Sequence, residues 1–180
     1  MRRIFIAADL PPDMREKMAA LKRDIKGVRW YGPDHIHLTM RFIGEVEDDI
    51  VGEVQQALYS IEAPAIELES DGVGLFFAKK RPRVIWVGLQ PAEPLKELRS
   101  RIDEALQHIG LPEDKKAFKP HVTIGKCKKA VDKGSVLDLK DDYGDWKEAA
   151  GKLSTLTLYS STLSPEGAIH TPLEHYPLNG

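Results

Sequence analysis

The sequence is poor in cysteine, has no long apolar run and shows no excess of charge of one sign. Cys127 is the single cysteine among 180 residues, which excludes an intrachain disulfide, and its place in a strand pattern indicates a small buried hydrophobic residue. No apolar run approaches the roughly 18 to 20 residues that span a bilayer, and the N-terminal apolar stretch is too short for a secretory signal. We therefore expect a cytoplasmic protein without a membrane-spanning segment.

The formal net charge of −2, from 26 basic and 28 acidic residues, excludes binding that depends on bulk positive charge, such as coating of long nucleic acid. Basic residues nevertheless gather in segment 78–83 (AKKRPR) and around residues 115–129, whereas acidic residues gather in segment 138–148. Local basic clusters in a near-neutral chain fit a small phosphate-bearing ligand or a nucleic-acid end. The alternative is that each is a solvated loop kept soluble by lysine.

Two segments share the pattern H-x-T-x, residues 37–40 (HLTM) and residues 121–124 (HVTI). In a strand, the two x residues of each segment share an apolar face, and the histidine and threonine share the other face. With six histidines and six threonines in the chain, random placement predicts roughly 0.2 H-x-T triplets, so two by accident is about a 2% event. One copy alone is more simply explained as a polar strand face, but the matched pair favours a functional site.

Strict alternation makes a specific prediction for the first of these strands. Three side chains are expected to pack inward: Leu38, Met40 and Phe42. Three others are expected to project together from the opposite face: His37, Thr39 and Arg41. Arg41 is thereby a candidate cleft residue.

The order strand, helix, histidine strand, helix, strand occurs twice along the chain. In the first copy the pattern predicts elements at 3–9, 12–25, 37–42, 47–62 and 65–76, with a short strand at 27–31. In the second copy it predicts elements at 83–89, 93–110, 119–126, 133–140 and 152–161, with a last strand at 167–178. Phe5 lies 32 positions before His37 and Trp86 lies 35 before His121, so the copies are nearly in register.

This repetition predicts an α+β fold built by internal duplication. We expect one two-lobed domain, residues 1–180, with approximate halves 1–78 and 79–180. Each half would form a mostly antiparallel sheet backed by helices. The two His/Thr faces would then look toward each other across a central cleft, and Phe5 could line that cleft as a contact for a base.

Two opposed histidines near neutral pH can supply one base and one acid, because both forms of imidazole are available there. An atom between them that gains a nucleophile and loses a leaving group matches in-line displacement at phosphorus. The threonine hydroxyls could donate hydrogen bonds to nonbridging phosphate oxygens. The scheme requires no cofactor and no metal, and a zinc site on His37 and His121 would lack further ligands on those strand faces.

The paired motifs resemble the signature of the two-histidine phosphoesterase superfamily. Several segments resemble more particularly the RNA 2′,3′-cyclic phosphodiesterases, also called 2′-5′ RNA ligases, over nearly the whole chain: RIFIAADLP, GVRWYGPDHIHLTMRFIGEV, RPRVIWVGL, FKPHVTIGK and LSPEGAIHTPLEHYPL. The resemblance implies a bilobal duplicated fold whose cleft is lined by both motifs. It also implies metal-independent hydrolysis of a terminal 2′,3′-cyclic phosphate on RNA to a 2′-phosphate.

The same resemblance implies that His37 is the proton donor to the leaving 3′ oxygen, that His121 is the proton acceptor that activates water, and that Thr39 and Thr123 hold the phosphate. The symmetry of the sequence alone does not assign the two histidine roles. Members of the family often carry arginine five residues after the second motif histidine, where this chain has Lys126, which keeps the charge but loses the bidentate fork. Simple alternation also places Lys126 opposite to His121, so a phosphate-binding role requires a strand end or a β-bulge.

The expected ligand is RNA with a 2′,3′-cyclic phosphate end or a small cyclic nucleotide, bound by a monomer. One alternative is a nucleotide- or RNA-end-binding module that uses the same cleft without a reaction. Another is the reverse reaction, in which a 5′-hydroxyl replaces water and a 2′-5′ linkage forms. The remaining histidines are expected to be structural or surface residues: His35, His108, His170 and His175.

Overall fold

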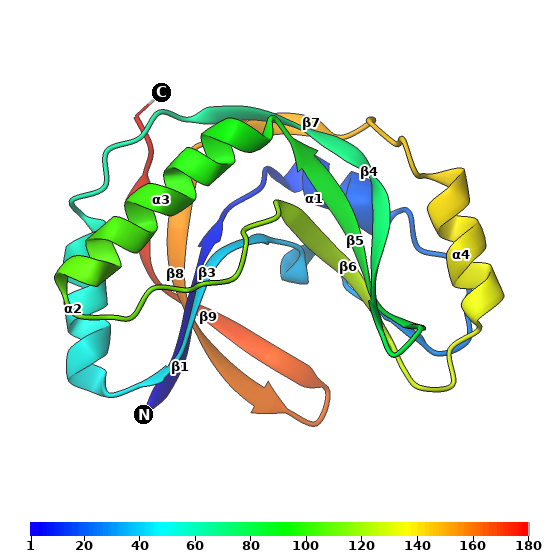
Figure 1. The fold of residues 1–180 in the computed structure, drawn as a ribbon, viewed down its shortest axis with the longest axis horizontal. Coiled ribbons are helices and arrows are strands. Elements are labelled where there is room, and N and C mark those ends of the chain that lie inside the picture. The colour runs from blue at the N-terminus through cyan, green and yellow to red at the C-terminus, as the bar shows by residue number, and fades with distance from the viewer. Residues whose placement is uncertain (180) are drawn as a thin grey trace.

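Two antiparallel sheets make up the β-structure in the computed structural model, which describes residues 1–179 (Figure 1). The first sheet has the order β3-β1-β8-β9, with β3 (Leu38–Val46), β1 (Arg2–Ala8), β8 (Thr155–Ser164) and β9 (Gly167–Pro177). The second has the order β2-β6-β5-β4-β7, with β2 (Val28–Trp30), β6 (His121–Cys127), β5 (Arg81–Gln90), β4 (Ile66–Ala78) and β7 (Ala150–Leu153). One H-x-T-x motif lies in each sheet, and the predicted α+β class is confirmed.

Strands are exchanged between the two sequence halves. Strand β4, from the first half, pairs with β5 in the second sheet, whereas β8, from the second half, pairs with β1 in the first sheet. The expected division into halves 1–78 and 79–180 therefore does not correspond to the two sheets. The repeat of element types was visible in the sequence, but pairing between distant strands has no local signal.

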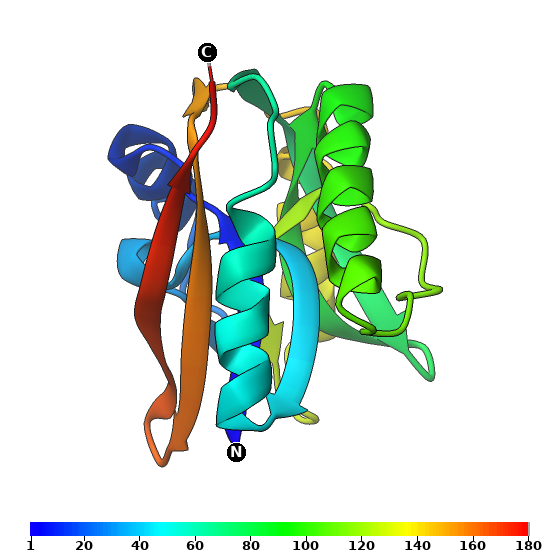
Figure 2. The same ribbon diagram turned by 90° about the vertical axis from the view of Figure 1, so that its left-hand side faces the viewer.

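Two helices cover the outer face of each sheet. Helices α2 (Asp48–Leu58) and α3 (Ala92–His108) pack against each other and against β1 and β3, as Figure 2 shows from the side of the first sheet. Helices α1 (Pro12–Ala19) and α4 (Lys133–Asp142) contact strands of the second sheet, and a short 3₁₀ turn, η1 (Pro33–His35), precedes the first motif. None of the helices in residues 1–179 is long and apolar enough to cross a membrane.

The apolar residues of both motifs lie in the core beneath these helices. Leu38, Met40 and Val122 are 0% exposed and Ile124 is 1% exposed. Burial of side chains of this size contributes roughly 1.5 to 3 kcal/mol each, which fixes the face that each motif turns inward. Cys127 is also buried, as predicted, and burial raises the pKa of its thiol.

Candidate active site

A β-bulge directly follows the threonine of the first motif. Thr39 pairs with Ala7 and Arg41 pairs with Ile6, so Met40 has no partner in β1. An extra residue in one strand reverses the alternation beyond it. Met40 and Arg41 consequently both face the core, although they are consecutive.

The second motif has the same irregularity at the equivalent position. Thr123 pairs with Trp86 and Gly125 pairs with Ile85, which leaves Ile124 as the extra residue of β6. Beyond this bulge, Lys126 returns to the face that carries His121 and Thr123, and all three side chains line one cavity. The bulge that a phosphate-binding role for Lys126 would require is therefore present.

The first bulge makes the simple alternation wrong for two residues. Phe42, expected in the core, is 48% exposed and lines the cavity. Arg41, expected in the cleft, is 5% exposed and is absent from the cavity lining. Phe42 and Lys126 each stand five positions after a motif histidine, so they occupy equivalent places on the two sides of the cavity.

The cavity between the sheets has a volume of ≈ 320 Å³. It brings together all four motif side chains: His37, Thr39, His121 and Thr123. Phe5 and Lys126 also line it, as do residues that the sequence analysis did not propose: Arg3, Tyr31, His35, Phe42 and His170. The geometry thus gathers four histidines, the hydroxyl groups of both motif threonines and two cationic side chains around one space large enough for part of a nucleotide.

His37 is held among aromatic rings and is neutral at pH 7. Its ring stacks on Phe5 with the centroids 5.2 Å apart, and His170 approaches edge-on at 5.4 Å. Burial, together with the nearby charge of His170, lowers the pKa of His37 to about 4, although a hydrogen bond with the backbone of His35 raises it in part. In the free protein this imidazole is therefore unprotonated near pH 7.

His121 has a defined tautomer. Its Nδ1 lies 2.6 Å from the carbonyl oxygen of Lys119. A carbonyl oxygen can only accept, so Nδ1 carries a proton and donates it, which leaves Nε2 as the atom available to a ligand. Phe76 supports the ring edge-on at 4.9 Å. A proton added at Nε2 would give a cation that the Lys119 carbonyl stabilises.

Phe5 lines the cavity but offers no open face for a base. It is 4% exposed, and its ring stacks on His37 at 5.2 Å and on Tyr159 at 5.3 Å. Burial and the charge of Asp9 raise the pKa of Tyr159 to about 12. Phe5 therefore orients His37. Phe42 presents a more exposed ring to the cavity, with the guanidinium of Arg3 lying over it at 5.1 Å from the ring centroid.

His170 reaches the cavity through tertiary structure, and His35 reaches it from the 3₁₀ turn directly before His37. His170 pairs with Ser161 of β8, and Ser161 pairs with Arg3 of β1, so the last hairpin carries His170 to the side of His37. The Nδ1 atom of His170 is buried without a hydrogen-bond partner among the described residues, and burial lowers its pKa. Both were expected to be structural or surface residues, but they line the cavity. His35 lies only two residues before His37, whereas no spacing in the sequence signals the position of His170.

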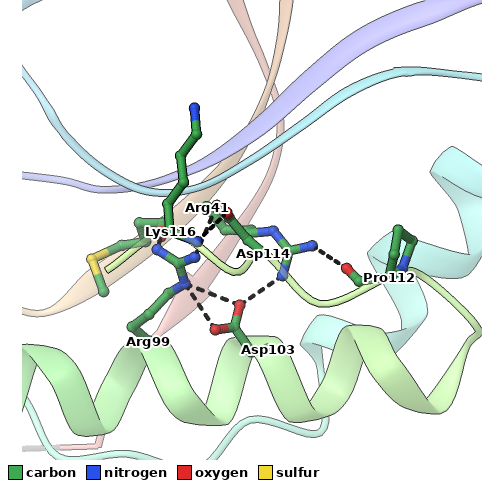
Figure 3. A network of polar contacts seen from close by, with 7 residues as sticks. Arg41, Arg99, Asp103, Pro112, Asp114 and Lys116 are labelled. Atoms are coloured by element: carbon green, nitrogen blue, oxygen red, sulfur yellow. Dashed lines mark hydrogen bonds and ion pairs between the residues drawn. The ribbon is translucent and has the colours of Figure 1, made fainter. Parts of the chain in front are cut away.

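Arg41 belongs to a buried ionic network that joins both motifs (Figure 3). It donates to Asp103 of α3 at 2.7 Å and to the carbonyl oxygen of Pro112 at 2.6 Å. Arg99 donates to the same Asp103 at 2.9 Å and to Asp114 at 3.1 Å. The amide of Lys116 and the two arginine charges lower the pKa of Asp114.

The network holds backbone on both sides of the cavity. Arg99 donates to the carbonyl oxygen of Met40, the bulged residue that follows Thr39, at 2.7 Å. Pro112, which accepts from Arg41, and Asp114, which accepts from Arg99, lie in the segment that leads to His121. Arg41 thus acts on the site from the core side, by fixing the strand that carries Thr39.

The described residues contain no group of three or more His, Cys, Asp or Glu side chains that could hold a metal ion. The aromatic, hydroxyl and cationic lining described above suits an anion. Catalysis without metal remains a prediction, because it depends on the reaction and not on this arrangement.

Comparison with known proteins is consistent with this site. A model of the 2′-5′ RNA ligase superfamily matches residues 9–164. The chain is 30% identical to the RNA 2′,3′-cyclic phosphodiesterase of Methanocaldococcus jannaschii over 97% of this chain and 99% of the relative, and 28% identical to that of Archaeoglobus fulgidus over 95% and 97%. The crystal structure of Escherichia coli LigT complexed with 3′-AMP matches with a TM-score of 0.80 and 25% identity over 99% of each chain. The chain therefore belongs to the 2′-5′ RNA ligase superfamily.

Proposed function

We propose that this protein hydrolyses the terminal 2′,3′-cyclic phosphate of RNA to a 2′-phosphate, with His37 and His121 as its acid and base. One observation carries the proposal: the two motifs place their histidine and threonine side chains around a single cavity from opposite sheets. Two curated relatives that align over nearly their whole length are named for the same activity. The enzyme would act on RNA ends or on small cyclic nucleotides.

In the proposed reaction, water attacks phosphorus opposite to the 3′ oxygen. His121 accepts the proton of the attacking water at Nε2 as the new P–O bond forms. His37 donates a proton to the 3′ oxygen as the P–O3′ bond breaks, so the 3′-hydroxyl is released and the phosphate stays on the 2′ oxygen. Thr39 and Thr123 donate hydrogen bonds to the nonbridging oxygens, and Lys126 adds a positive charge. The proton lost by one histidine in one cycle must be returned through solvent before the next.

The nucleoside would lie on the side of His37, because His37 protonates the oxygen that remains attached to it. Phe42 presents its exposed ring on this side of the cavity, and stacking of a base on such a ring is worth roughly 1 to 3 kcal/mol. Water would approach from the side of His121. Replacement of that water by a 5′-hydroxyl would give ligation with the same two histidines.

Product analysis with a cyclic-ended RNA and with a nucleoside 2′,3′-cyclic phosphate, both in EDTA, tests the proposal. We expect a 2′-phosphate product, and single replacements His37→Ala and His121→Ala should each reduce kcat/KM by about 10² to 10⁴-fold. The double variant should lose much less than the product of the two losses, because the residues act as a unit. His108→Ala, on the exposed end of α3, is the matched control and should keep full activity.

Four outcomes separate the alternatives. Turnover that appears only when metal is restored would reject the mechanism, and so would a folded, fully active variant at either motif histidine. Tight binding of the cyclic-ended RNA without product would favour a binding module. A 2′-5′ linked product in the presence of a 5′-hydroxyl RNA would add ligation to the activity.

We also propose that the protein acts as a monomer in the cytoplasm, since one chain supplies both motifs to the cavity. Light scattering at the concentration of the activity assay checks the first statement, and fractionation of the source cells checks the second.

A further inference from the structure

A surface of uncompensated positive charge begins at the cavity and follows the end of the second sheet where the β4–β5 turn lies. We call it the basic edge and define it by eight residues: Lys79, Lys80, Arg81, Arg83, Lys126, Lys128, Lys129 and Lys133. Within the described part of the chain, none of the eight lies within 4.0 Å of a carboxylate. The proposed reaction at the two histidines uses only Lys126 of this set.

The basic edge is continuous in space. Lys126 lines the cavity and pairs with Val84 of β5, and Arg83 is the next residue of that strand. Lys80 lies four residues before Val84, which is roughly 13 Å along a strand. The ammonium of Lys133 donates to the carbonyl oxygen of Lys80 at 3.2 Å. Figure 1 shows the β4–β5 turn and the β6–α4 connection beside each other at the same end of the sheet.

The equivalent end of the first sheet has more acidic than basic residues, although Arg2 and Arg3 of β1 also lie there. The β6–α4 connection is basic, whereas the end of β3 and the start of α2 carry four carboxylates: Glu45, Glu47, Asp48 and Asp49. Among these residues Asp48 forms an ion pair, with Arg2 at 3.4 Å, and both partners are exposed. A polyanion that leaves the cavity is attracted to one end of the molecule and repelled from the other.

The turn between β4 and β5 is a costly place for lysine. Ala78 pairs with Arg81, so Lys79 and Lys80 form a two-residue hairpin loop, and their φ angles are 49° and 66°. Such turns favour Asn-Gly, because both central residues need positive φ. Lysine there opposes the local backbone preference, and both side chains project from the tip as exposed cations. Residues that oppose the conformational preference of the local backbone are frequent at functional sites.

From these observations we infer that the basic edge binds the phosphates that precede the cyclic end of a single-stranded RNA. The inference rests on the proposed function, since the cyclic phosphate must occupy the cavity beside Lys126. It names the preferred substrate: an oligonucleotide that runs from the cavity toward the β4–β5 turn, rather than a mononucleotide, which has no such phosphates. Acidic residues at the other end of the cleft set this direction.

The double variant Lys79→Asn/Lys80→Gly tests the inference without risk to folding. Asn-Gly suits the turn, so the variant should unfold at a temperature equal to or above that of the wild type. It should hydrolyse a nucleoside 2′,3′-cyclic phosphate at the wild-type rate. With a cyclic-ended oligonucleotide, the slope of log kcat/KM against log salt should become less negative by about 1.4, from roughly 0.7 for each of two lost phosphate contacts. The ratio of wild-type to variant kcat/KM with this oligonucleotide should accordingly fall about 7-fold between roughly 50 and 200 mM salt.

The control is Lys147→Asn/Lys152→Asn, which removes the same formal charge at the edge strand β7 and just before it, where Lys147 forms an exposed ion pair with Asp71 at 3.9 Å. We expect the salt slope of this control to equal that of the wild type. Equal slopes for all three proteins, or an equal loss in both double variants, would overturn the inference and leave the proposed function intact. If the wild type hydrolyses neither substrate, the proposed function fails. The basic edge is then tested separately by fluorescence anisotropy with the same oligonucleotide, and equal affinity of the wild type and Lys79→Asn/Lys80→Gly would reject the inference.

Discussion

Binding of a phosphodiester anion is expected to raise the pKa of His37 from about 4 to about 7. The lower value is that of the free protein, in which burial and the charge of His170 disfavour the imidazolium. With this pKa, roughly one molecule in 10³ carries the proton at pH 7. A proton donor in this position is therefore effective only if the substrate itself restores the proton.

Coulomb's law gives the size of that effect. A single negative charge about 4 Å from the imidazolium, at an effective dielectric constant of about 20, stabilises it by roughly 4 kcal/mol. Since about 1.4 kcal/mol changes a pKa by one, the pKa of His37 should rise by about 3 when the anion binds. Protonation and anion binding strengthen each other. Because the anion raises the pKa of His37, it binds the protonated protein more tightly, and its affinity should increase as the pH falls from 7 toward 4.

NMR titration of the histidine ring signals measures both values directly, with His37→Gln to assign the resonance. A thymidine dinucleotide is a suitable anion, because its single phosphodiester keeps one charge across the titration and it has no 2′-hydroxyl to react. Thymidine without phosphate is the control and should leave the pKa near 4. In the pH profile, the limb that reports His37 should lie near 4 in kcat/KM and near 7 in kcat, because the first describes the free enzyme and the second the complex.

Two results would refute this reasoning. If His37 titrates near its ordinary pKa of about 6.5 in the free protein, burial among Phe5 and His170 does not have the effect described. If saturation with the dinucleotide leaves the pKa at about 4, His37 cannot hold a proton for the leaving oxygen. It would then be the base, and His121 would have to be the acid.

Two further predictions concern the threonines and the buried network. Thr39→Val and Thr123→Val should each lower kcat/KM by about 10- to 150-fold in steady-state assays, because each deletes one hydrogen bond to a charged oxygen, worth roughly 1.5 to 3 kcal/mol, and melting temperatures should not change. A fully active variant at either position would remove that hydroxyl from the mechanism. Asp103→Ala leaves Arg41 and Arg99, whose side chains are 6% and 10% exposed, without their shared carboxylate. This change should lower the free energy of unfolding by about 3 kcal/mol in denaturant titration. An unchanged midpoint, equal to that of the exposed neighbour variant Glu104→Ala, would contradict the prediction.

The parts of this fold that could be predicted are those that local periodicity determines. The helix α3 buries Leu95, Leu98 and Ile102 at helical spacing, as the sequence indicated. Each motif turns its aliphatic residues to the core because a strand alternates faces. These signals lie within a few residues of one another, so no knowledge of tertiary structure is needed.

The predictions failed for residues whose orientation or position depends on the strand with which their own strand pairs. The bulge at Met40 exists only relative to β1, and it exchanges the faces of Arg41 and Phe42. A single sequence shows no trace of it, since Met40 is as apolar as an ordinary strand residue. His170 likewise reaches the cavity only because β9 pairs with β8, and β8 with β1. Contacts between residues separated by more than a hundred positions leave no periodic pattern to detect.

The duplication by itself cannot orient a ligand, because two equivalent H-x-T-x strands would hold a phosphate equally well in either direction. Orientation must come from positions where the two copies differ. The residues just beyond the bulges are such positions: Phe42 supplies an aromatic ring on the side of His37, and Lys126 supplies a charge on the side of His121. A base prefers the first and a phosphate the second, so the bulges, by turning these two residues into the cavity, give a symmetric scaffold the polarity that a reaction with one acid and one base requires.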